Sequence, residues 1–149
     1  MQSQWASIYR FPNHLVVCPE SQTTAGMKVA VEPFQVLPIP VSPTELGAAI
    51  QRALAESRWD FPQPTDWKKL ASPRLAAAGV KTEAAFQKKS QLVSAEFNGE
   101  VLKFVPYRNG GAVGMTKGFE AAVEHERMVK DMSSEALGTA AFLTFESCA

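Results

Sequence analysis

Apolar positions between residues 42 and 57 recur with the spacing of an amphipathic helix. This spacing of three and four residues predicts one buried stripe along a helix. The stripe consists of Leu46, Ala49, Ile50, Ala53, Leu54 and Ser57. Ser42 can cap the free backbone amides, Pro43 suits the first helical position, and Glu45 completes a capping box. We therefore expect a helix over residues 42–57.

A second helix of the same kind is expected at residues 133–148, which read SSEALGTAAFLTFESC. Both segments open with Ser-x-x-x-Leu-Gly, and both follow an extended apolar stretch. In the second helix, Phe142 and Leu143 add apolar surface outside the stripe, which predicts burial on more sides. The repetition has two interpretations: two sheet-covering helices that share a capping signal, or a duplicated half.

Alternating apolar residues predict two hairpins. Residues 5–11 and 14–18 read as strands joined at Pro12-Asn13, and residues 91–97 and 100–107 flank Asn98-Gly99. A two-residue turn at Asn98-Gly99 would place Phe97 opposite Glu100. Residues 34–41 predict an edge strand or one that ends early, because Pro38 and Pro40 cannot donate to a ladder.

Other segments are less regular. Residues 58–73 predict a loop anchored by Trp59, Phe61 and Trp67, with a short helix near residues 66–70; another short helix is expected at 82–89. The glycine-rich stretch 109–118 predicts a loop, because it lacks both the P-loop lysine and the dinucleotide fingerprint. Residues 119–130 have the composition of a helix but alternate like a strand, and we predict a strand.

These elements predict one α+β domain over residues 1–149, with a mainly antiparallel sheet covered by helices 42–57 and 133–148. A chain of 149 residues buries about two-thirds of its unfolded surface, so the core needs neither disulfides nor metal. The two cysteines, Cys18 and Cys148, lie in apolar settings typical of small core residues. The sequence shows no signal peptide and no apolar run long enough to span a membrane, which predicts a cytoplasmic protein.

Charge is unevenly distributed although the net charge is zero. Residues 58–108 contain nine Lys and Arg against five Asp and Glu, a balance of +4. Residues 109–149 contain three against six, a balance of −3. This asymmetry predicts a basic flank and an acidic flank, although a solvated surface often gives the same pattern.

The sequence contains no convincing catalytic or metal-binding constellation. His14 and His125 lack the spacing of a zinc site, and Cys18 lies too far along its strand from His14 to form a dyad. Glu124 and Glu126 would point the same way on a strand, but an exposed acidic face explains such a pair more often. We expect no catalytic residue, no metal, no cofactor and no small-molecule substrate.

Nucleic-acid binding is the leading alternative from the residues alone. Lysines at positions 68, 69, 88 and 89 could form a basic surface, the first pair next to an aromatic residue. The pI near 6.7 argues against nucleic acid as the main partner. A small hydrolase is a weaker alternative.

The stretch VLPIPVSPTELGAAIQRALAESR, residues 36–58, resembles the immunity proteins of bacterial contact-dependent growth-inhibition (CDI) systems. Members of that family carry a similar strand, a Glu-Leu-Gly helix start and an Ala-Leu-x-x-Ser-Arg helix end. These are capping and packing residues and do not form an active site. The small α+β layout agrees as well.

The resemblance implies a cytoplasmic inhibitor and not an enzyme. Its partner would be the C-terminal toxin domain of a sibling cell, often a nuclease, with no direct role for nucleic acid or membrane. Nuclease toxins tend to be basic around the substrate cleft, so acidic side chains of the inhibitor would meet them. The candidate toxin-binding residues are Glu120, Glu124, Glu126, Asp131, Glu135, Trp67, Phe119 and Tyr107.

Overall fold

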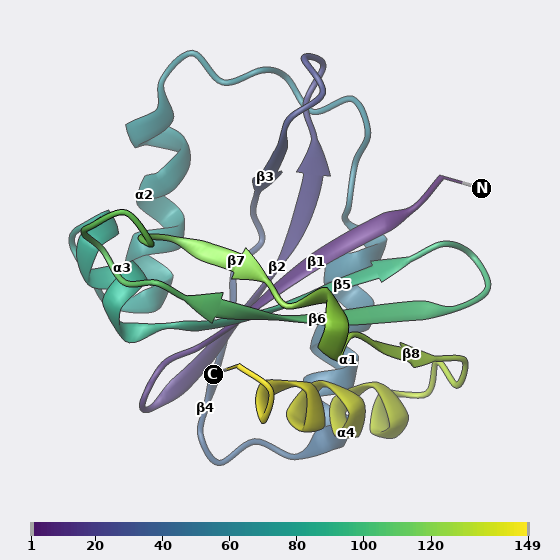
Figure 1. The fold of residues 1–149 in the computed structure, drawn as a ribbon. Coiled ribbons are helices and arrows are strands. Elements are labelled where there is room, and N and C mark those ends of the chain that lie inside the picture. Colours follow the sequence, from purple (N-terminus) through teal and green to yellow (C-terminus); the bar gives the residue numbers. More distant parts are fainter. Residues whose placement is uncertain (1, 149) are drawn as a thin grey trace.

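The computed structural model describes residues 2–148 and is built around one curled antiparallel sheet (Figure 1). Four long strands form its centre in the order β2-β1-β5-β6. Their bounds are β1 Gln4–Arg10, β2 His14–Gln22, β5 Gln91–Phe97 and β6 Leu102–Asn109. Each of the predicted hairpins, β1–β2 and β5–β6, is therefore present, and β1 pairs with β5 at the middle of the sheet.

Four short strands complete the two edges. β3 (Lys28–Ala30) and β4 (Gln35–Pro38) both pair with β2, at different points along it. β7 (Phe119–Ala121) and β8 (Arg127–Val129) pair with β6 in the same manner. The expected edge strand before the first helix is thus confirmed as β4, whereas β3 was not predicted.

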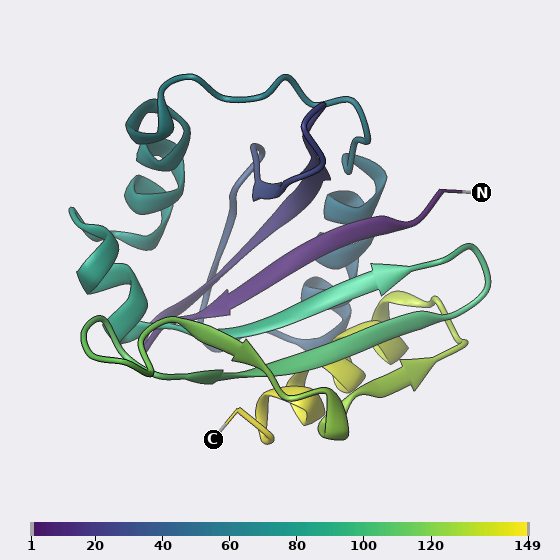
Figure 2. The ribbon, with the colours of Figure 1, turned by 45° about the horizontal axis from the view of Figure 1, so that its top comes forward.

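Helices cover both faces of the sheet (Figure 2). α1 (Pro43–Ala55) and α4 (Ser134–Phe145) pack on one face, where the main core includes Ile8, Leu54 and Phe145. α2 (Trp67–Ala78) and α3 (Glu83–Lys89) lie against one end of the other face, around a smaller core that includes Tyr9 and Phe86. The α+β class and the two sheet-covering helices are confirmed.

The chain contains the same arrangement twice. Residues 4–55 form a hairpin, two short strands and a helix, and residues 91–145 form the same series. The registers match as well: Leu15 of β2 lies opposite Leu37 of β4, and Leu102 of β6 lies opposite Val129 of β8. The repetition seen in the two helix sequences therefore extends to the whole of each half, and residues 56–90 connect the halves.

Glycines at matching positions bring α1 and α4 into close contact. A Cβ on Gly47 would lie 1.7 Å from the carbonyl oxygen of Ser134, and one on Gly138 would lie 1.7 Å from that of Pro43. Ser42 and Ser133 cap the two helices, and each hydroxyl accepts a hydrogen bond from an amide three residues ahead. The shared Ser-x-x-x-Leu-Gly motif thus provides a cap and a site of close backbone approach in each helix.

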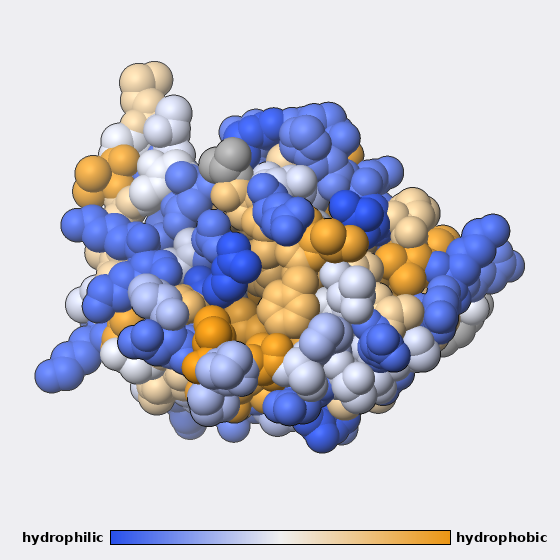
Figure 3. Space-filling model, turned by 90° about the horizontal axis from the view of Figure 1, so that it is seen from below, coloured by the Kyte–Doolittle hydropathy of each residue, from blue (hydrophilic) through white to orange (hydrophobic). Residues whose placement is uncertain are grey.

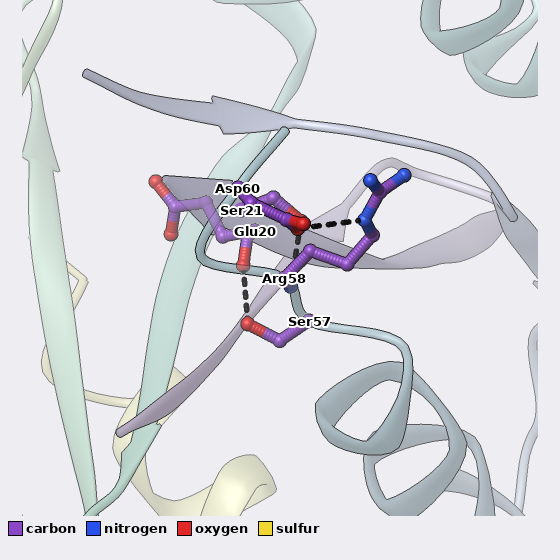
Figure 4. Close-up of polar contacts among 5 residues, drawn as sticks. All are labelled: Glu20, Ser21, Ser57, Arg58 and Asp60. Atoms are coloured by element: carbon purple, nitrogen blue, oxygen red, sulfur yellow. Dashed lines mark hydrogen bonds and ion pairs between the residues drawn. The ribbon is translucent and has the colours of Figure 1, made fainter. Parts of the chain in front are cut away.

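The segment after α1 is anchored to the sheet (Figure 4). The Ser57 hydroxyl donates to the carbonyl of Glu20 over 2.7 Å, and the Arg58 amide donates to the Ser21 hydroxyl over 3.0 Å. Trp59 then packs on Trp5, with ring centroids 4.8 Å apart. These contacts confirm the aromatic anchoring of the loop for Trp59.

Three local predictions were wrong. The β5–β6 turn spans Asn98–Val101, so Phe97 lies opposite Leu102 and not Glu100; Asn98 accepts two amide hydrogen bonds within this longer turn. The short helix expected at 66–70 continues to Ala78, with Pro73 inside it. The strand expected over 119–130 is interrupted by a 3-10 turn, η1 (Val123–His125), so Glu124 and Glu126 do not share a strand face.

Candidate functional site

The five predicted acidic residues lie along one segment, from β7 to the first turn of α4, and all are exposed. We call Glu120, Glu124, Glu126, Asp131 and Glu135 the acidic strip. β7 and β8 pair with opposite ends of β6, so the strip extends along this edge of the sheet and does not form one cluster. It therefore presents spaced carboxylates, with the exposed Arg127 and Lys130 among them, and not a concentrated site.

One carboxylate of the acidic strip forms an ion pair. Glu124 in η1 forms an ion pair with Arg108 of β6, and both side chains are about half exposed. An exposed pair of this kind adds roughly 0–1 kcal/mol to stability. Its main consequence is electrostatic, because Arg108 offsets one negative charge in the middle of the strip.

Asp131 and Glu135 stand at the N-terminus of α4. The Ser133 amide donates to Asp131 Oδ1 over 2.9 Å, and this hydrogen bond lowers the pKa of the Asp131 carboxyl below its usual value. Glu135 lies in the first turn of the helix, where negative charge is favoured by the helix dipole. Both carboxylates can therefore stabilise the N-terminus of α4 and also contact a protein partner.

A groove of about 510 Å³ separates β8 from α4. Asp131 and Glu135 lie on its border, the exposed side chain of Leu143 supplies an apolar wall, and Met128 of β8 borders the groove while its side chain alternates to the face of Lys103. The remaining lining residues are Arg127, Val129, Ser133, Ala136, Thr139 and Ala140. Hydrophobic patterning did not reveal this groove, because its lining combines off-stripe positions of α4 with residues of the short strand β8.

The three predicted aromatic residues do not form one exposed site with the acidic strip, although Phe119 directly precedes Glu120 in β7. Tyr107 and Phe119 are partly buried and pack against each other, with centroids 6.4 Å apart, at the edge of the smaller core. Trp67 begins α2 and is 46% exposed. Of the three, Trp67 is therefore the most accessible, but it lies on a different element from the acidic residues.

A second groove, of about 530 Å³, lies between the loop after α1 and helix α2. Phe34, Phe61 and Leu70 contribute apolar lining, and Asp66 and Lys69 contribute charge. The prolines and aromatic residues of this loop were the only feature of the sequence that could have indicated a groove here. From the sequence, they were interpreted only as residues that anchor the loop to the core.

Apolar surface also gathers on the side of α1 and α4. Figure 3 shows this side as an apolar hollow surrounded by hydrophilic side chains. Ile39, directly after β4, and Leu143 on α4 are more than 40% exposed. Exposed apolar surface rimmed by polar groups is typical of a protein-binding face.

Cys18 and His14 both lie in β2. Cys18 is buried, and this burial raises the pKa of its thiol, with the nearby Glu20 adding to the effect. His14 stacks on Phe11 beside the first hairpin turn. Within residues 2–148, no group of three or more His, Cys, Asp or Glu side chains is placed to hold a metal ion. In the same range no helix is long and apolar enough to cross a membrane.

Comparison with solved structures shows that the fold recurs in small bacterial proteins. A protein of unknown function from Neisseria meningitidis superposes with a TM-score of 0.78 at 21% identity, covering 99% of this chain and 96% of that one. A chain of a CdiA-CT/CdiI toxin and immunity complex from Yersinia pseudotuberculosis superposes with a TM-score of 0.76 at 16% identity, covering 100% and 99%. No curated protein matches the chain significantly.

The family of the chain follows from its sequence. The family model described as CDI immunity protein matches residues 4–148, which is nearly the whole chain. The protein therefore belongs to the CDI immunity proteins. The resemblance first noted in residues 36–58 is confirmed over both halves of the fold.

Proposed function

We propose that the protein binds the C-terminal domain of its cognate CDI toxin, a basic nuclease, in a tight stoichiometric complex and so protects the cell that makes it. Family membership supports the immunity role and a toxin as the protein partner. The complex blocks the toxin's active site or the path of its substrate. The protein needs no catalytic chemistry of its own for this task.

The acidic strip supports the proposal that the toxin is a basic nuclease. Three of its carboxylates lie along the β6 edge of the sheet and two lie at the start of α4, all in the part of the chain that has a −3 balance. A negative surface raises the encounter rate with a basic partner, and this gain falls as salt screens the charges. Apolar and aromatic contacts, with Trp67 the most accessible of the predicted anchors, would supply more of the affinity than the charges.

Charge reversal tests this arrangement. Replacing Glu120, Glu124 and Glu126 together by lysine should slow association with the toxin domain severalfold at low salt, and the difference should shrink as salt increases. Stopped-flow association rates measured from low to physiological salt give the readout. We expect Glu124→Lys alone to have the smallest effect, because Arg108 already offsets that carboxylate.

A matched control reverses three exposed glutamates outside the strip, Glu32, Glu45 and Glu56, which changes the net charge equally. This control should slow association much less than reversal in the strip. Equal rates for both triple variants, together with intact protection of toxin-expressing cells, would place the interface on another face. Salt-dependent binding of RNA or DNA that is lost on mutating Lys68 and Lys69 would instead favour a nucleic-acid-binding module.

A further inference from the structure

The two halves of the fold differ at one corresponding place, the space between the last short strand and the helix that follows it. In the first half this space lies between β4 and α1, and in the second it lies between β8 and α4. Gln35 of β4 and Arg127 of β8 hold the same position, opposite Val17 of β2 and Phe104 of β6 respectively. Arg52 and Leu143 likewise stand ten residues after their helix caps, Ser42 and Ser133.

In the first half, side chains of the protein occupy this space. Gln35 Nε2 donates to the carbonyl oxygen of Ala49 over 2.8 Å, which joins β4 to α1. Arg52 Nε donates to Gln35 Oε1, also over 2.8 Å, and so lies across the strand–helix junction. An amide and a guanidinium therefore bridge the strand and the helix.

In the second half the same space is the open groove of about 510 Å³. Arg127 and Leu143 replace the glutamine–arginine pair, and both line the groove. Ala140, which corresponds to Ala49, lies in the groove wall. In the first half, side chains of the protein therefore bridge this space, whereas in the second half the corresponding space stays open.

The border of the groove also differs in charge. Asp131 and Glu135 line it, whereas the positions that correspond to them around Ser42 are the uncharged Pro40 and Thr44. The Ser133 amide holds the pKa of Asp131 low, so this carboxylate is ionised at neutral pH. Two carboxylates against one guanidinium, that of Arg127, leave the lining with a net negative charge.

We propose that the groove between β8 and α4 binds a segment of the toxin that inserts one arginine or lysine side chain beside an apolar residue. The cation lies near Asp131 and Glu135, and the apolar residue contacts Leu143 and Ala136. The first half shows that the corresponding strand–helix junction of this fold accommodates a guanidinium, that of Arg52. This inference rests on the proposed immunity function and locates its interface.

A transplant of the first-half pair tests the proposal. The double variant Arg127→Gln, Leu143→Arg reproduces the glutamine–arginine pair in the second half and should close the groove. Binding is measured by titration calorimetry against the purified C-terminal domain of the toxin encoded immediately upstream. We expect the dissociation constant to rise at least tenfold while the circular dichroism spectrum stays unchanged.

A second variant and a reciprocal control accompany it. Thr139→Trp places a bulky side chain in the groove from an exposed position of α4, where folding is not at risk, and should weaken binding similarly. The reciprocal variant Gln35→Arg, Arg52→Leu opens the first half and leaves the second half as it is. Its affinity for the toxin should stay within about twofold, since sites far apart without shared partners act independently.

The outcomes separate this inference from the proposed function. If the unmodified protein binds the toxin and both groove variants bind equally well, the groove is not the docking site, although the immunity function stands. An equal loss in the reciprocal control would also overturn the proposal. If the unmodified protein neither binds nor protects, the proposed function itself fails. A homodimer in sedimentation that Thr139→Trp dissociates would assign the groove to a second copy of the chain and overturn the proposal.

Discussion

Replacing Gly138 by alanine should destabilise the protein, although the same change stabilises an isolated helix by roughly 1 kcal/mol. The new Cβ would lie 1.7 Å from the Pro43 carbonyl oxygen, and real Cβ atoms essentially never approach closer than 3.0 Å. That oxygen is backbone, so no side-chain rotation relieves the clash, and α1 and α4 must separate by more than an ångström. Overpacking of a core costs about 1–3 kcal/mol and sometimes more.

The net loss should be roughly 1–2 kcal/mol, because a clash with backbone puts the overpacking cost in the upper part of its range and the helix-propensity gain offsets about 1 kcal/mol of it. At this chain length, each kcal/mol lowers the melting temperature by roughly 2–4 °C. Urea unfolding followed by circular dichroism gives the free energy directly. Thr139→Ala, at the neighbouring exposed position of α4, is the control and should change stability little. A Gly138→Ala protein as stable as the unmodified one would refute the close contact.

The symmetry of the contact adds a sharper test. Gly47→Ala should cost about as much, because its Cβ would meet the Ser134 carbonyl oxygen at the same 1.7 Å. One separation of the two helices relieves both clashes, so the double variant should lose less than the sum of the single losses. Strict additivity would show that the two glycines contact independent surroundings.

Two further predictions concern the core and a buried carboxyl. Leu54→Ala and Phe145→Ala should each cost roughly 2–5 kcal/mol in urea unfolding, because both side chains are buried in the main core and leave cavities; an unchanged midpoint would contradict this packing. Burial raises the pKa of the Glu20 carboxyl, against smaller lowering effects of Ser7 and Lys28, so the folded state holds this proton more tightly than the unfolded chain. Glu20 therefore adds stability below its unfolded pKa of about 4.3, and this contribution is lost as pH rises through the raised value. Measured as a function of pH, the stability of the unmodified protein relative to Glu20→Gln should fall over that interval, and a constant difference would contradict the shift.

The sequence predicted those helices and hairpins that depend on interactions between residues close together in the chain. The cap at Ser42 and the apolar stripe from Leu46 to Leu54 specified α1 to within two residues, because capping and helical periodicity depend on neighbours along the chain. The sequence also predicted the hairpin at Asn98, but the predicted strand register differs from the observed one by two residues. That register depends on the hydrogen bonds within the longer turn, which pattern alone does not contain.

The candidate site depends on pairings between distant residues, and only the tertiary structure decided them. The acidic residues were identified from composition, but their arrangement along the β6 edge follows from the separate pairing of β7 and β8. The ion pair of Arg108 with Glu124 likewise requires that strand register.

The sequence by itself determined that two helices share one motif, and it left the meaning of that motif open. The structure showed that Gly47 and Gly138 allow the two helix backbones to meet, and that Gln35 and Arg52 fill a space which stays open in the second half. Each of these features joins residues that are far apart in the chain. Their contact energies depend on the packed three-dimensional arrangement, so no window of the sequence expresses them.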